Sequence, residues 1–263
     1  MTYVLFLAAV APPLFLAYVI FKLNTFKQMK VEVCLRLFIY GGLIGIPIIF
    51  AEQFTRPILE EFTQSVFLTM LIGVALIEEF FKYLAVKLVV YDKVRFNAPI
   101  DGIVYTVMVG LGFALAENVS YVFSANSPED GMGLAIGRMF TAIPAHALFG
   151  VFMGYFLGRA QLDKDDEVRL IILGLLSAIL LHATYNSLAV EQPLYFAVIL
   201  LVVAFFFAIA VIRKAQINSG LVPQDINSDI EPSSEYFSKA LDEVEAGVEC
   251  TPSALVGHNW PIA

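Results

Sequence analysis

The stretch LIGVALIEEFFKYLAVKLVV, residues 71–90, is apolar enough to lie in a membrane, but it carries Glu78, Glu79 and Lys82 at its centre. Placing one acidic or basic residue at the middle of a membrane helix costs roughly 3 kcal/mol. A helix that only anchors a protein has no reason to carry three of them. The stretch therefore indicates a membrane helix whose charges either neutralise one another or take part in chemistry.

The composition of the whole chain is that of a polytopic membrane protein. Of its 263 residues, 59% are hydrophobic and only 15% are charged, and the mean hydropathy is +0.78. A hydrocarbon core of about 30 Å is crossed by roughly 20 helical residues. Apolar runs of about this length predict an all-α transmembrane bundle with seven spans, at residues 3–21, 33–50, 66–90, 98–123, 134–157, 168–190 and 193–212.

Basic residues are distributed unevenly between the connections that join these runs. They gather after the first, third, fifth and seventh runs, whereas the other connections hold only Arg56. Cytoplasmic connections of membrane proteins carry the excess of lysine and arginine. We therefore expect a multi-pass protein of the plasma membrane, with its N-terminus on the extracytoplasmic side and its C-terminus in the cytoplasm.

The composition changes near residue 214, which divides the chain into a transmembrane domain, residues 1–214, and a tail, residues 215–263. The tail holds eight acidic residues and one lysine. One short stretch, residues 235–246, has the pattern of an amphipathic helix, and the rest has the composition of a disordered cytoplasmic segment. The chain contains no glycine-rich phosphate loop and no HExxH sequence. We expect neither nucleotides nor nucleic acids among its partners.

The ionisable residues expected deep in the bilayer lie in four consecutive runs, the third to the sixth. The fourth run contains Glu117 and Asn118, the fifth contains His146, and the sixth contains His182 and Asn186. With a helical rise of 1.5 Å per residue, the acids and histidines come at about 9–20 Å from the outer ends of their runs. They are therefore predicted to share one layer in the outer half of the membrane.

Small residues at four-residue spacing indicate that each histidine faces another helix and not lipid. In the fifth run these residues are Ala142, Gly150, Gly154 and Gly158, and the fourth and sixth runs contain similar series. Pro144 lacks a backbone donor, so it should also kink the fifth run beside His146.

Three interpretations of the buried charges compete. Glu78 and Lys82 have the spacing of an internal ion pair, so a structural salt bridge is one of them. One lysine neutralises only one carboxylate, however, and the second needs a proton, a metal ion or a protonated histidine. Buried acids and histidines also suit a proton-coupled or cation transporter. Transporters often contain repeated halves, and the polar residues here run through the chain once, which favours catalysis.

Polar motifs in four consecutive runs resemble those of a known family. They are Glu78-Glu79-x-x-Lys82, Phe113-x-x-x-Glu117-Asn118, a single His146, and His182-x-x-x-Asn186. Together they resemble the PrsW family of bacterial intramembrane proteases, which is related to the CAAX prenyl endopeptidases and the CPBP proteins. The resemblance covers residues 66–190. CAAX endopeptidases have histidine at the position of Glu117, so prenylated substrates are not expected to carry over.

The resemblance implies a core like that of the CAAX endopeptidases and a place in a bacterial plasma membrane. It also implies a single-span membrane protein as substrate, such as an anti-sigma factor, cut near the extracytoplasmic face in a stress response. Amide hydrolysis needs an activated water, oxyanion stabilisation and a proton for the leaving amine. Glu78 and Glu79 are the predicted base and its partner, His146 and His182 polarise water or the carbonyl group, and Asn186 is a candidate oxyanion donor.

A metal-dependent mechanism uses the same residues. His146 and His182, with Glu117 or Glu79, would give zinc three protein ligands and an open position, and another glutamate would serve as base. The spacing of the residues does not choose between this mechanism and a metal-free one. The predicted supporting residues are Lys82, Glu117, Asn118 and Asn186.

Overall fold

The computed structural model describes residues 2–23, 31–91, 93, 96 and 98–217 of the chain. The chain divides into two units, residues 1–221 and 222–263, and the features below all belong to the first. Residues 218–263, which hold nearly all of the predicted acidic tail and its amphipathic stretch at 235–246, lie outside the described residues.

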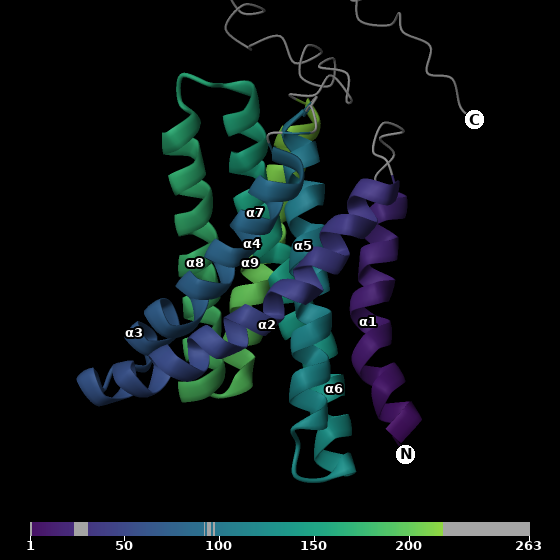
Figure 1. Cartoon of the computed structure of the whole chain (residues 1–263), viewed down its shortest axis with the longest axis vertical. Helices are drawn as coiled ribbons and strands as arrows, with labels where there is room; N and C mark the ends of the chain where they lie inside the picture. The colour runs from purple at the N-terminus through teal and green to yellow at the C-terminus, as the bar shows by residue number, and fades with distance from the viewer. Residues whose placement is uncertain (1, 24–30, 92, 94–95, 97, 218–263) are drawn as a thin grey trace, which may run out of the picture. The chain divides into compact units, whose positions relative to one another are not determined.

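The described secondary structure is entirely helical, which confirms the predicted all-α bundle (Figure 1). The elements are α1 (Thr2–Leu23), α2 (Val31–Phe62), α3 (Val66–Met70), the π-helical segment η1 (Leu71–Ala75), α4 (Leu76–Val86), the π-helical segment η2 (Lys87–Tyr91), α5 (Pro99–Phe123), α6 (Pro128–Phe140), α7 (Ala142–Leu162), α8 (Glu167–Glu191) and α9 (Leu194–Ile217). Among the described residues, six stretches are long and apolar enough to cross a membrane: Thr2–Lys22, Val31–Phe62, Pro99–Phe123, Pro128–Leu162, Glu167–Glu191 and Leu194–Ile217.

The remaining predicted span, residues 66–90, is helical but not one regular helix. It consists of α3, η1, α4 and η2 in succession, and none of these alone is long enough to cross a membrane. In a π-helical turn each hydrogen bond spans five residues, whereas it spans four in an α-helix, and such turns are frequent at functional sites. Here η1 comes two residues before Glu78, so it sets the direction in which α4 presents its two glutamates.

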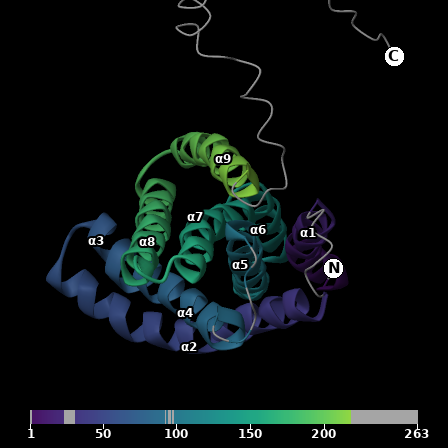
Figure 2. The same cartoon turned by 90° about the horizontal axis from the view of Figure 1, so that it is seen from above.

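Helices α5 and α7 lie inside the bundle, and α1, α2, α8 and α9 lie around them (Figure 2). Of the residues in the most apolar part of α5, 89% are buried, whereas the corresponding share is 22% in both α1 and α9. The outer helices expose large apolar side chains, as expected of surfaces that face lipid. Two of the four polar motifs fall on these inner helices, and the other two fall on α4 and α8, which pack against them.

Helices α5 and α7 pack with their backbones in contact, as the small-residue spacing predicts. A Cβ atom added at Gly154 would meet the Thr106 hydroxyl and the carbonyl oxygen of Gly102, and one added at Gly110 would lie 2.9 Å from the carbonyl oxygen of His146. The Thr106 hydroxyl donates a hydrogen bond of 2.7 Å to the carbonyl of Gly150. This close approach brings the polar residues of α5 next to those of α7.

The kink predicted in the fifth run is confirmed as a break between α6 and α7. Pro144 cannot donate to the carbonyl of Phe140, and its ring would clash with that carbonyl in a continuous helix. Thr141, between the two helices, has φ −123° and ψ −78°, and its hydroxyl donates to the carbonyl of Gly137 at 2.8 Å. The break lies little more than one turn before His146, where the kink was expected.

The second predicted span, residues 33–50, is shorter than the helix that the structure contains there. Helix α2 continues to Phe62, and its added part carries charged residues at four-residue spacing, Glu52, Arg56 and Glu60. These lie on one face, while Phe54 on another face is exposed. A search for apolar runs stops at the first charged residue, although an amphipathic helix continues past it.

Candidate active site

Polar residues of several helices line a cavity of about 820 Å³. Its walls come from α2 and from the C-terminal parts of α5 and α8, together with α3, η1, α4, α6 and α7. The end of α5 and the start of α6 lie at the same end of the bundle as the N-terminus of the chain (Figure 1). The volume is in the range of small-molecule and peptide binding sites.

Lys82 connects both glutamates of α4 with a histidine of α7. Its Nζ atom lies 2.7 Å from Oε1 of Glu79, 3.0 Å from Oε2 of Glu78 and 3.2 Å from Nδ1 of His146. It also lies 4.2 Å from the centre of the Phe113 ring. The predicted lysine–glutamate pair is confirmed, and the structure adds that one lysine serves both carboxylates.

His182 is held by Glu79 on one side of its ring. Its Nδ1 lies 2.9 Å from Oε1 of Glu79, and its Nε2 lies 4.0 Å from Oε2 of Glu78. A carboxylate accepts hydrogen bonds, so it favours the tautomer with hydrogen on Nδ1 and a free lone pair on Nε2. The ring stacks on Phe149, with centroids 4.6 Å apart. Glu79 therefore orients His182, and the free nitrogen faces Glu78.

His146 lies between Lys82 and Glu117. Its Nδ1 faces Nζ of Lys82, and its Nε2 lies 2.8 Å from Oε2 of Glu117. An ammonium group can only donate, so Nδ1 accepts and Nε2–H donates to the carboxylate. The rings of His146 and His182 are 5.4 Å apart, at nearly a right angle. The predicted convergence of the two histidines is confirmed.

Arg138 of α6 was not recognised as a site residue in the sequence. Its Nη2 lies 2.7 Å from Oε2 of Glu117, and its Nε lies 3.0 Å from Oδ1 of Asn118. The amide of Asn118 in turn donates to the carbonyl of Ala9 at 2.7 Å. Pro13 has no N–H to satisfy that carbonyl within α1, so Asn118 replaces the missing donor. Asn118 therefore links α5 to α1 and also binds Arg138.

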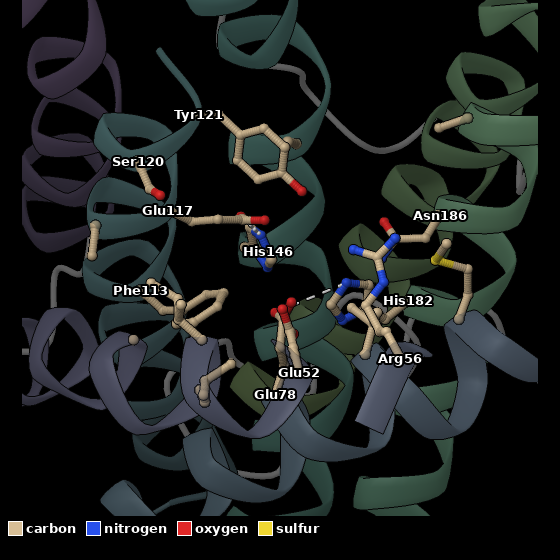
Figure 3. A pocket seen from close by; sticks show the side chains of 18 of the residues that line it. Glu52, Arg56, Glu78, Phe113, Glu117, Ser120, Tyr121, His146, His182 and Asn186 are labelled. Carbon is tan, nitrogen blue, oxygen red and sulfur yellow. Dashed lines mark hydrogen bonds and ion pairs between the residues drawn. The ribbon is translucent and has the colours of Figure 1, made fainter. Parts of the chain in front are cut away.

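The predicted site residues occupy two levels. Those that line the cavity are Glu78, Glu117, His146, His182 and Asn186 (Figure 3). Glu79 and Lys82 lie behind them, fully enclosed by protein. Helix α2 adds Glu52 and Arg56 to the cavity wall, although the ionisable residues of the site were expected only in the third to sixth runs. Their four-residue spacing was the signal that could have identified them.

Three of these residues fit a metal ion. Glu78, His146 and His182 each offer one ligand atom, and the three atoms lie within 4.8 Å of one another at buried positions. Two histidines and a carboxylate are a ligand set of catalytic zinc sites, and a second carboxylate that orients a ligating histidine is their usual support. The carboxylate that this group places beside the histidines is Glu78, whereas the sequence suggested Glu117 or Glu79. Both ring nitrogens of His146 have partners, so a bound metal would replace one of these contacts.

Comparison with known proteins agrees with these features. The family described as PrsW family intramembrane metalloprotease matches residues 30–212. The chain is 34% identical over 180 residues to a protein named Protease PrsW from Oceanobacillus iheyensis, an alignment that covers 68% of this chain and 80% of the relative. It is 29% identical over 211 residues to Protease PrsW from Halalkalibacterium halodurans, covering 79% and 95%, and 28% identical over 212 residues to that from Bacillus subtilis, covering 80% and 94%. No solved structure matches the chain.

Proposed function

The chain belongs to the PrsW family of intramembrane metalloproteases and is therefore a peptidase, and we propose that it cuts a single-span membrane protein at the cavity described above. The observation that carries the proposal is the convergence of Glu78, His146 and His182 at buried positions on the cavity wall. Membership of a peptidase family leaves the transporter interpretation without support.

The predicted site residues can be assigned roles in amide hydrolysis. Glu78 and the free Nε2 of His182 face the same part of the cavity, where they can hold a water molecule against the scissile carbonyl. Glu79 and Lys82 hold these two groups in place from behind. Asn186, one helical turn after His182 on the same wall, is the proposed donor to the oxyanion.

The same residues suit the metal that the family description implies. Glu78, His146 and His182 would hold a zinc ion, and Glu79 would orient His182 toward it. When bound, zinc supplies a Lewis acid that polarises a carbonyl group and activates water. The protein then contributes orientation, because the ring of His182 is fixed by Phe149 and that of His146 by Glu117.

We place the cut near the extracytoplasmic face of a bacterial plasma membrane. The cavity wall includes Ser120 and Ser124 near the end of α5, and Val190 near the end of α8. The basic connections lie at the opposite ends of these helices, which the positive-inside rule assigns to the cytoplasm. A helical substrate protects its amides by internal hydrogen bonds, so the cut should fall where the target chain leaves its helix. An anti-sigma-factor-like protein is the substrate class that the family resemblance suggests.

The test compares membrane proteins in bacterial cells that produce the wild-type chain with those in cells that produce Glu78→Gln. New N-termini should appear only with the wild type, within about two helical turns of the extracytoplasmic end of a single span. Glu61→Gln, an exposed acid on α2 that does not line the cavity, is the matched control and should behave as the wild type. The same termini with Glu78→Gln, or none with the wild type, would refute the proposal.

A further inference from the structure

We propose that Glu52 of α2 is a further catalytic carboxylate, which together with Glu78 holds the water that attacks the peptide bond. This inference rests on the proposed function and extends the site to a helix outside the four motifs of the sequence. Glu52 lines the cavity, and its carboxyl group contacts that of Glu78 (Figure 3).

The hydrogen bonding of Glu52 is incomplete. Its Oε1 atom is buried and receives no hydrogen bond from the described part of the chain. The neighbouring Glu78 presents carboxylate oxygens, which are acceptors as well. A buried acceptor without a donor costs about 1–3 kcal/mol. A water molecule has two O–H donors and can serve both carboxylates at once, so this pair of side chains is suited to bind one.

The other two carboxylates of the predicted site, Glu79 and Glu117, already have donors. Glu79 is bound by Lys82 and His182, and Glu117 is bound by Arg138 and His146. These contacts fix both groups, so neither is free to hold a water in the cavity.

Arg56, one turn after Glu52, does not neutralise it in an ion pair. Its guanidinium lies 3.8 Å from Glu60, at an exposed part of the cavity wall where the two side chains are 41% and 59% exposed. Its buried Nε also has no hydrogen-bond partner in the described part of the chain. Glu52 therefore keeps an accepting oxygen in the cavity, which a structural ion pair would have used.

The chemical step is balanced with Glu52 as acceptor. The water oxygen forms a bond to the carbonyl carbon, and one of its protons passes to the Glu52 carboxylate. The carbon–nitrogen bond then breaks, and this proton passes to the leaving amine nitrogen, which restores the carboxylate. If Glu78 ligates a metal together with His146 and His182, its oxygen is committed, and Glu52 supplies the separate glutamate that a zinc peptidase needs.

The test uses a peptide that spans the cut site found in the comparison of N-termini, with the full-length chain in detergent. Glu52→Gln should lower kcat at least ~10²-fold, the scale of a lost general base, and leave KM within about threefold. Its zinc content and its thermal midpoint should match those of the wild type. Glu61→Gln, an exposed acid of α2 that does not line the cavity, should retain full kcat.

A second variant separates catalysis from structure. Glu52→Met fills the same space without a buried unpaired acceptor, so it should be inactive and at least as stable as the wild type. Four outcomes would overturn the inference: kcat within threefold of wild type in Glu52→Gln, loss of zinc in that variant, a raised KM with unchanged kcat, or unfolding of Glu52→Met. If Glu78→Gln is inactive while Glu52→Gln is active, the inference fails and the proposed function stands.

Discussion

Replacing Lys82 by methionine tests whether this residue holds the buried site together. The lysine side chain is 5% exposed and lies within 3.0 Å of two carboxylates that are 3% and 1% exposed. Methionine has a similar length and fills the space, so the main loss is the charge. Removing one partner of a buried ion pair costs about 3–5 kcal/mol, because the other charge stays buried without compensation. For a domain of this size, that should lower the thermal midpoint by roughly 6–20 °C.

The chain offers its own reporter of unfolding. Cys34 is 4% exposed, so a thiol-reactive fluorophore labels it only when the helices separate. Cys250, in the tail, is replaced by serine in every variant so that the signal comes from one thiol. Lys164→Met is the matched control. The ion pair of Lys164 with Glu167 is partly exposed, so it should contribute no more than about 1 kcal/mol to the free energy of unfolding.

A double variant provides the decisive comparison. Glu79→Gln combined with Lys82→Met removes the uncompensated charge and keeps an acceptor for His182. The free energy of unfolding of this double variant should therefore lie within about 2 kcal/mol of the wild-type value. A single variant as stable as the Lys164→Met control, or a double variant no more stable than Lys82→Met alone, would show that the lysine is not the centre of this network.

Three further predictions follow from the rest of the structure. Arg138→Gln should lower the free energy of unfolding by about 1.5–3 kcal/mol, because it removes a charge-assisted hydrogen bond to Glu117. Arg138→Lys should recover only part of this loss, because a single ammonium group cannot replace both contacts of the guanidinium. Thermal unfolding measures both variants. Ser120→Cys, on the cavity wall, should react with a membrane-impermeant thiol reagent from the extracytoplasmic side, and labelling from the cytoplasm alone would reverse the proposed orientation. Removing residues 218–263 should leave cleavage within about threefold of the wild type, because the cavity is lined by residues 45–190; loss of all cleavage in a correctly inserted protein would show that the tail completes the site.

The sequence could predict the layer of acids and histidines because both depth and facing follow from helix geometry. A fixed rise per residue places His146 and His182 at similar depth, and small residues at four-residue spacing place them on packed faces. These two rules hold whatever the detailed packing is, and the structure brings the two rings within 5.4 Å.

Three features of the site could not be predicted in this way. Glu78 and Glu79 are adjacent, and only the packing of η1 and α4 decides which one faces the cavity. Asn118 binds a carbonyl of Ala9, 109 residues away, that is free only because of Pro13. The contribution of Glu52 depends on α2 lying across the bundle beside α4 and α5, an arrangement that no local pattern specifies.

The most direct test of the account is X-ray absorption spectroscopy at the zinc edge on the purified full-length chain. Because Glu78, His146 and His182 bring three ligand atoms within 4.8 Å, the account predicts one bound zinc per chain, with two imidazole rings and carboxylate or water oxygens as its ligands. The Glu78→Gln variant should bind zinc more weakly, and His146→Ala with His182→Ala should show no imidazole signal. A wild-type chain whose zinc lacks imidazole ligands, or whose spectrum is unchanged in these variants, would contradict the assignment of this cluster as the metal site.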